Sequence, residues 1–247
     1  MIIPNPELYN RQVLLIGKEN QSKLSFKTVV LIGVGGLGSP IALYLSRIGI
    51  KKLILVDPDI VEYSNLSRQT MYSADDAKLK KSKVEIANEK LSDFCEIETH
   101  KTIDENDSSF MDNADLVIGA IDNWNARYKL NELCVKKKVP FIDIAVEGFS
   151  GHIIWVNAKN NKDDKTHNNF CIKCVFSKDD QKVKRPIPII NTTCIFAVAI
   201  ALNQILTFFI DDKYPENKIT YFNAKTCLIQ YFEAKPRKGC VCSIGNN

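Results

Sequence analysis

The sequence predicts an α/β protein with a Rossmann-like, doubly wound, mostly parallel sheet that antiparallel strands extend toward the C-terminus. Three observations predict this fold. Short apolar runs alternate with helical patterns over residues 1–150, and a glycine-rich turn directly follows the first run. Beyond Gly151 this alternation of strand and helix ends. With 247 residues, of which 45% are hydrophobic, the chain can bury a core of this size.

The first half of the chain alternates between the two kinds of pattern. The expected strands are Thr28–Ile32, Lys52–Val56, Leu116–Ala120 and Phe141–Ile144. The helical patterns between them lie near Pro40–Arg47, Lys81–Leu91 and Asn125–Lys136. Such alternation is typical of a parallel sheet that helices cover on both faces.

The second half has a different order of elements. The segment "GHIIWVNA" predicts an antiparallel strand, and Asn157–Asn169 predicts a polar loop. A buried helix is expected over Thr192–Phe209, followed by strands at Lys218–Asn223 and Cys227–Phe232. We interpret residues 1–247 as a single domain, in which 1–150 form a nucleotide-binding half and 151–247 a smaller elaboration of the same sheet.

Charge and hydropathy exclude several classes of protein. The net charge of +4 is too small to favour a nucleic-acid partner. The most apolar stretch, Cys194–Ile210, contains Asn203 and Gln204, which favours a buried helix over a membrane span. The N-terminal residues lack a secretory pattern, and eight cysteines without one indicate a reducing compartment. We therefore expect a cytoplasmic protein without a membrane partner.

The stretch "VVLIGVGGLGSP" places Gly33, Gly35 and Gly38 in a G-x-G-x-x-G pattern between a strand and a helix, with Gly36 as an additional glycine. Glycines allow backbone N–H groups to reach phosphate oxygens, and the helix N-terminus adds a favourable dipole. Asp57 ends the next strand nineteen residues after Gly38, where a carboxylate accepts hydrogen bonds from ribose hydroxyls. The pair predicts a ribonucleotide site but does not separate a redox dinucleotide from ATP.

Further polar residues favour ATP. A hydride transferase needs a flat apolar slot and one acid–base group, whereas a polyphosphate needs cations, and a carboxylate could hold Mg²⁺ between its phosphates. The residues in question surround the loop along the chain: Arg11, Asp59, Asn65, Arg68, Gln69, Lys83, Asp122 and Asn123.

At these residues the sequence resembles the superfamily of ubiquitin-like-protein activating enzymes, the E1-like or ThiF/MoeB/HesA family. The segments that carry the resemblance are "YNRQ", "GVGGLG", "VDPDIVEYSNLSRQ", "KSKVE", "IDNWNARYKLN", "VPFIDIAVEGFSGHI", "CIKC" and "GC". The resemblance covers nearly the whole chain.

The resemblance implies adenylation by ATP of the C-terminal glycine carboxylate of a small β-grasp protein, which is either ubiquitin-like or a sulfur carrier ending in Gly-Gly. It implies that Gly36 and its neighbours lie under the phosphates, that Asp57 holds the ribose, and that Asp122 binds Mg²⁺. The phosphate charge would be stabilised by Arg11, Arg68 and Lys83, beside Asn65 and Gln69. It also implies a homodimer in which Arg68 reaches the neighbouring subunit, and residues 151–247 as the half that binds the carrier protein.

The cysteines form two pairs, Cys171 with Cys174 in C-x-x-C spacing and Cys240 with Cys242 in C-x-C spacing. Together, four thiolates would form a closed structural zinc site. Relatives usually have C-x-x-C at both pairs, so Cys242 is the ligand that the departure puts in question. Two unrelated pairs of buried thiols are the alternative. Cys194, at the start of the late helix, is interpreted as a core thiol rather than an acceptor of the activated carboxylate.

Other functions stay open at this stage. The same superfamily includes ATP-dependent tRNA-modifying dehydratases, although the paired cysteines favour the branch that activates proteins. A non-catalytic scaffold subunit of a heterodimeric activating enzyme is a second alternative. A scaffold would have no physical need for Arg11, Arg68, Lys83 and Asp122 together.

Overall fold

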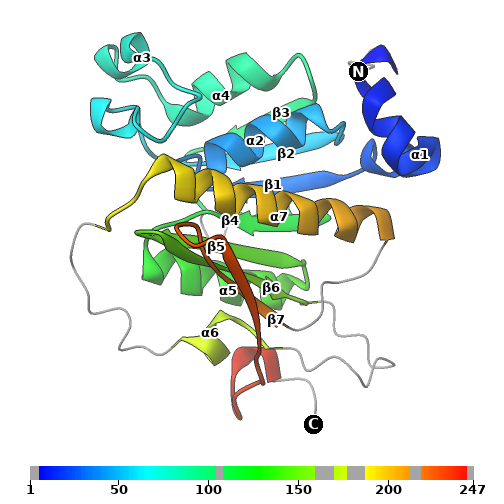
Figure 1. Cartoon of the computed structure of the whole chain (residues 1–247), viewed down its shortest axis with the longest axis vertical. Coiled ribbons are helices and arrows are strands. Elements are labelled where there is room, and N and C mark those ends of the chain that lie inside the picture. The colour runs from blue at the N-terminus through cyan, green and yellow to red at the C-terminus, as the bar shows by residue number, and fades with distance from the viewer. Residues whose placement is uncertain (1–5, 104–107, 159–169, 177–186, 212–217, 244–247) are drawn as a thin grey trace.

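A computed structural model describes residues 6–103, 108–158, 170–176, 187–211 and 218–243. Within these residues one sheet has the strand order β3-β2-β1-β4-β5-β6-β7-β8. Helices cover this sheet on both sides (Figure 1). The predicted α/β fold class is confirmed. The polar loop expected over Asn157–Asn169 falls mostly outside the described residues.

The first five strands in the chain form the parallel part of the sheet. They are β1 (Thr28–Ile32), β2 (Lys52–Val56), β3 (Glu96–His100), β4 (Leu116–Gly119) and β5 (Phe141–Glu147). The sequence did not predict β3, because this edge strand is largely polar and lacks a continuous apolar run.

The last three strands are antiparallel: β6 (Ser150–Val156), β7 (Lys218–Asn223) and β8 (Leu228–Glu233). Their bounds lie within two residues of the predicted ones. The edge strand β8 is exposed along its whole length.

Alternate residues of the strands pack into two separate hydrophobic cores, one on each face of the sheet. In β1, Val29 and Leu31 face the core under α2 (Gly38–Arg47), α4 (Lys83–Leu91) and α7 (Asn191–Asp211). Val30 and Ile32 face the core under α5 (Trp124–Lys137) and the short α6 (Ile172–Val175). The strands are buried on both faces, which explains why they read as uninterrupted apolar runs.

The helix α7 is, among the described residues, the one whose length and composition would allow it to cross a membrane. Here it lies across the sheet (Figure 1) and packs on β5 and β6. The residues of its buried stripe recur every three or four positions: Thr193, Cys194, Ala197, Val198, Ala201, Ile205 and Phe209. This is the packing of a core helix.

The N-terminal helix α1 (Asn10–Leu24) was not predicted, because its apolar residues do not form one face and Gly17 interrupts it with φ 82°. It rests on the connection between α2 and β2. The side-chain amides of Gln12 and Gln21 both donate to the carbonyl oxygen of Ile48. The short helix α3 (Ala74–Lys78) and the 3-10 helices Pro6–Tyr9, Tyr63–Asn65, Ser109–Met111 and Val241–Ser243 complete the described elements.

The strand order fixes where a ligand can bind. Because β1 lies between β2 and β4, the connection that follows β1 runs to one side of it and the connection that follows β3 runs to the other. In folds of this kind a crevice lies between two such connections, at the carboxyl ends of β1 and β4. The residues that follow these ends are Gly33 after β1, Asp57 after β2 and Asp122 near the end of β4. The topology therefore gathers three of the predicted site segments at one edge of the sheet.

Candidate functional site

The four glycines of the loop have two different surroundings. Gly33 has φ +89°, and a Cβ there would lie 2.5 Å from the carbonyl oxygen of Ala120, while a Cβ on Gly38 would overlap the carbonyl of Gly33. These two glycines permit close packing of backbone on backbone. Gly35 and Gly36 instead face side chains, so one side of the loop packs on backbone and the other is lined by side chains.

The side of the loop at Gly35 and Gly36 faces two long polar side chains. A Cβ on Gly35 would lie 3.5 Å from Nε2 of Gln69, and one on Gly36 would lie 3.3 Å from Cγ of Arg68. Gln69 is 4% exposed, and its Oε1 has no hydrogen-bond partner among the described residues. A buried amide oxygen without a partner costs free energy unless a ligand or water satisfies it.

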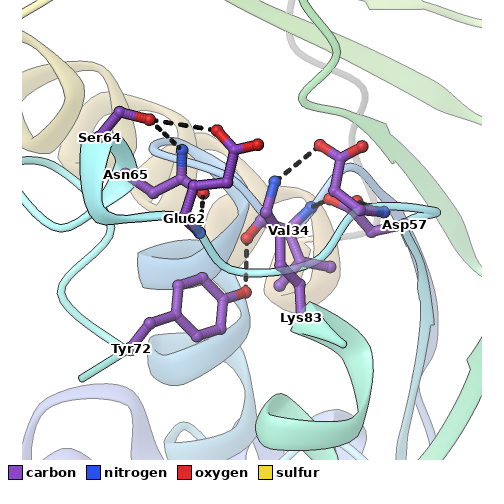
Figure 2. Close-up of polar contacts among 8 residues, drawn as sticks. Val34, Asp57, Glu62, Ser64, Asn65, Tyr72 and Lys83 are labelled. Atoms are coloured by element: carbon purple, nitrogen blue, oxygen red, sulfur yellow. Dashed lines mark hydrogen bonds and ion pairs between the residues drawn. The ribbon is translucent and has the colours of Figure 1, made fainter. Parts of the chain in front are cut away.

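The buried carboxylate of Asp57 joins the second strand to the glycine loop. One of its oxygens accepts from the backbone N–H of Val34 at 2.6 Å and the other from that of Asp59 at 2.9 Å (Figure 2). Burial raises the pKa of Asp57, and the bond from Val34 and the charge of Lys83 oppose this shift. On the other side of the loop, the hydroxyl of Tyr72 donates to the carbonyl oxygen of Val34 at 2.7 Å.

Lys83 begins α4 and points back to the end of β2. Its ammonium lies 2.7 Å from Oδ2 of Asp59, and its backbone N–H donates to the carbonyl oxygen of the same residue. The Lys83 side chain is buried, whereas that of Asp59 is mostly exposed. Since an ammonium has three donors, Lys83 can contact a further anion without leaving Asp59.

The segment around η2 (Tyr63–Asn65) places the other predicted residues. The side-chain oxygen of Asn65 accepts from the backbone N–H of Glu62, which fixes the turn (Figure 2). Arg68 donates to the carbonyl oxygen of Ser64 at 3.0 Å. Arg68 lies over Gly36 of its own chain. The expectation that it reaches a neighbouring subunit stays a prediction.

Cys194 approaches the same loop from α7. Its Sγ lies 3.5 Å from the position of a Cβ on Gly36. Burial raises the pKa of this thiol, with a smaller opposing effect of Arg68. A protonated, buried thiol fits the interpretation of Cys194 as a core residue.

Asp122 and Asn123 follow β4 and open α5. The Asp122 side chain is exposed at the carboxyl edge of the sheet. The side-chain oxygen of Asn123 accepts from the backbone N–H of Ala126 at 3.1 Å and so caps the helix. Asn123 was predicted as a cofactor contact, and its oxygen is already engaged by this cap.

Arg11 does not join the other predicted residues. It lies on α1 next to Tyr9, whose ring contacts the position of a Cβ on Gly49. Gly49 follows the C-terminal end of α2, whereas the glycine loop adjoins its beginning at Gly38. Ten helical residues span about 15 Å, so Arg11 lies at the other end of α2 from the loop.

The four predicted cysteines come together near the C-terminal 3-10 helix (Val241–Ser243). The Sγ atoms of Cys171, Cys174, Cys240 and Cys242 all lie within 4.8 Å of one another. Two separations, Cys171 to Cys240 and Cys174 to Cys242, are 3.5 and 3.4 Å. Hydrogen bonds from Cys242 and then Asn131 lower the pKa of Cys171 to about 5. This cluster could hold a metal ion, and the C-x-C spacing does not keep Cys242 out of it.

Sequence reasoning missed a buried aspartate beside the site and the buried arginine that it contacts. Asp143 on β5 is fully buried and contacts Arg127 of α5 and His152 of β6. An acid inside the apolar run "FIDIAV" was the available signal, because a buried carboxylate requires a cationic or donor partner.

Comparison with known proteins identifies the family of the chain. The ThiF family model matches residues 9–243. The chain is 34% identical to "Adenylyltransferase and sulfurtransferase MOCS3" of Anopheles gambiae over 95% of this chain and 54% of that protein. It is also 34% identical to "SAMP-activating enzyme E1" of Haloferax volcanii over 96% of this chain and 88% of that protein.

The chain is also similar to more distant proteins. "Sulfur carrier protein ThiS adenylyltransferase" of Escherichia coli is 25% identical over 97% of this chain and 95% of that protein. The crystal structure of E. coli MccB with ATP superimposes with a TM-score of 0.80 at 21% identity, covering 96% of this chain and 75% of that one, which supports the fold. The chain spans 54% of the Anopheles protein and 38% of a similar protein from Culex quinquefasciatus.

The hydrogen bond from Tyr72 to the loop can be tested by removing one oxygen. We expect Tyr72→Phe to lower the free energy of unfolding by about 1–3 kcal/mol, because the buried Val34 carbonyl loses its donor. Tyr231→Phe is the matched control, since its ring is exposed on β8. Denaturant unfolding of both variants measures the difference, and equal midpoints would show that the bond does not stabilise the loop.

Proposed function

This chain belongs to the ThiF family, and from that premise we propose that it uses ATP to adenylate the C-terminal carboxylate of a small ubiquitin-like or sulfur-carrier protein. The observation that carries the proposal is the side of the glycine loop where Arg68 and Gln69 face Gly36 and Gly35. A cation and an amide at a loop before a helix suit a polyphosphate. By name, the three relatives are adenylyltransferases or an activating enzyme.

In the proposed reaction a carboxylate oxygen of the carrier protein attacks the α-phosphorus of ATP. The bond from that phosphorus to the bridging oxygen breaks, and pyrophosphate leaves with the electron pair. A terminal carboxylate is ionised at neutral pH, so no general base is required. Arg68 and Lys83 would stabilise the charge on the phosphate oxygens, and the beginning of α2 adds its dipole. The remaining lone pairs of Asp57 would accept from the ribose hydroxyls.

Asp122 is the proposed Mg²⁺ ligand. Its exposed carboxylate at the carboxyl edge of the sheet fits an ion that keeps several waters and bridges phosphates. Such an ion would neutralise charge on the departing pyrophosphate.

The carrier protein is proposed to dock on residues 151–247 and to end in Gly-Gly. The exposed edge strand β8 supports this, because its apolar side chains Leu228, Ile229, Tyr231 and Phe232 lie at the surface. An exposed apolar edge strand of this kind favours pairing with another protein.

Pyrophosphate exchange tests the adenylation step. With Mg·ATP and small proteins ending in Gly-Gly from the same proteome, we expect labelled pyrophosphate to enter ATP. Asp122→Ala should reduce exchange by about a hundredfold or more, because the charge on the leaving group is no longer neutralised. Asp57→Ala should mainly raise the KM for ATP. Asp93→Ala is the control, because this exposed acid lies two residues beyond the C-terminal end of α4. Undiminished exchange in Asp122→Ala would remove this residue from the mechanism, and a wild-type protein that binds its partner without exchange would favour a scaffold.

Zinc is the proposed metal of the cysteine cluster, since four thiolates at these separations fit a tetrahedral site with Zn–S distances of about 2.3 Å. We expect about one zinc per chain. Cys171→Ser, Cys174→Ser and Cys242→Ser should each lower zinc content and melting temperature, because metal binding stabilises the fold. Cys227→Ser, exposed and outside the cluster, should change neither. Elemental analysis and thermal unfolding measure both. If Cys242→Ser keeps its zinc, the C-x-C pair supplies only one ligand.

We further propose a homodimer in which Arg11 acts at the partner's site. Two observations support it: Arg11 lies at the far end of α2 from its own loop, and its neighbours Leu14 and Leu15 are 80% and 85% exposed. Exposed leucines on one helix favour burial against another chain.

Mixing of inactive variants tests this arrangement. Arg11→Ala and Asp122→Ala should each be nearly inactive alone. After subunit exchange, one site of each mixed dimer would regain both groups, so about a quarter of all sites should work. The exchange assay reads the recovered activity. A mixture that recovers nothing would place Arg11 in its own chain's site or outside the mechanism.

A further inference from the structure

Arg127 occupies an unusual position beside the predicted metal ligand. It lies one turn into α5, is 5% exposed, and its Nη2 donates to the carbonyl oxygen of Ile121 at 2.6 Å. Ile121 is joined to Asp122 by a planar peptide bond. The hydrogen bond therefore fixes the plane from which the Asp122 backbone continues.

A residue of the sheet holds the guanidinium of Arg127 in place. Its Nη1 lies 3.4 Å from Oδ2 of Asp143, a fully buried residue on β5. The same oxygen lies 3.2 Å from Nε2 of His152 on β6. The ring of Trp124 lies under the guanidinium, with 4.9 Å from its carbon to the ring centroid. Arg127 is thus fixed between Asp143 of β5, the ring of Trp124 and the turn.

The turn is closed a second time by the helix cap. Asn123 accepts from the N–H of Ala126, and the N–H of Arg127 donates to the carbonyl oxygen of Asn123. Residues 121–127 therefore form a ring of hydrogen bonds from which the exposed side chain of Asp122 projects.

From this geometry we infer that Arg127, held by Asp143, is a positioning residue for Asp122. His152 acts one contact further away, through Asp143. The inference rests on the proposed function and deepens it. Arg127 donates to the backbone of the turn and leaves the carboxylate of Asp122 free for an ion. A buried Arg–Asp pair is weak support for stability by itself, so a role in orientation is the stronger reason for it. A misplacement of about 1 Å at a reacting group can cost about a hundredfold in rate.

The first test separates metal positioning from nucleotide binding without using activity. The probes are Mn²⁺ and the non-hydrolysable nucleotide AMPCPP, with Mn²⁺ binding followed by electron paramagnetic resonance. Arg127→Gln should weaken Mn²⁺ binding to the protein–nucleotide complex about tenfold, while the affinity for metal-free AMPCPP stays within about twofold. Lys129→Ala, an exposed cation on the same helix, should match wild type. Unchanged Mn²⁺ binding in folded Arg127→Gln, or an equal loss of metal-free AMPCPP affinity, would overturn the inference.

Two further variants keep the inference testable if Arg127→Gln unfolds. Arg127→Lys keeps the positive charge but loses the planar, two-pronged guanidinium that contacts Ile121 and Asp143, so it should recover only part of the Mn²⁺ affinity. Asp143→Asn removes the negative charge that pairs with Arg127 but leaves Arg127 itself in place. It should therefore lower the Mn²⁺ affinity less than Arg127→Gln does. Wild-type behaviour of both would overturn the inference.

The exchange assay then separates this inference from the proposed function. In the positioning role, Arg127→Gln lowers kcat about tenfold or more and leaves the KM for ATP nearly unchanged. A raised KM with unchanged kcat would overturn the inference. Absence of exchange in the wild-type protein would instead count against adenylation, and the Mn²⁺ titration would still decide the role of Arg127.

Discussion

The buried carboxylate of Asp57 is the interaction on which the rest of the site depends. Its two oxygens accept from Val34 in the glycine loop and from Asp59 in the following segment. Asp59 in turn holds Lys83, so one acid connects β1, β2 and α4. Burial disfavours the ionised form of Asp57, and the two backbone donors with Lys83 offset part of that cost. Loop, cation and strand end are therefore oriented before any ligand arrives.

The fold could largely be predicted because its physical signals are local. Strands buried on both faces produce continuous apolar runs, and the glycine turn marks the first crossover. The elements that were missed lack such signals. The edge strand β3 needs no apolar run, and α1 buries Leu24 while Leu14 and Leu15 remain exposed. What stabilises α1 is a pair of glutamine contacts to Ile48, which follow from tertiary structure.

The site could be predicted as a set of residues but not as a geometry. Arg68 and Gln69 do face the loop, and the four cysteines do meet. The position of Arg11 depends on where α1 packs, and the use of Asn123 as a cap depends on where α5 begins. The contact between Arg127 and Asp143 joins residues sixteen positions apart on a helix and a strand. No periodicity in the sequence encodes a pairing of that kind.

In the glycine loop, backbone atoms surround one pair of glycines and side chains surround the other, and this difference affects which substitutions can accumulate in evolution. A side chain at Gly33 or Gly38 would collide with backbone, so a change at these positions forces the backbone to shift and destabilises the fold. At Gly35 a Cβ would meet the end of the Gln69 side chain, and at Gly36 it would meet side-chain atoms of Arg68 and Cys194, in each case at 3.3 Å or more and without touching backbone. A descendant that no longer needs a nucleotide can therefore acquire side chains at these two positions and still fold. Among divergent copies, the inner pair of glycines records whether the nucleotide is still in use, and the outer pair records only that the sheet persists.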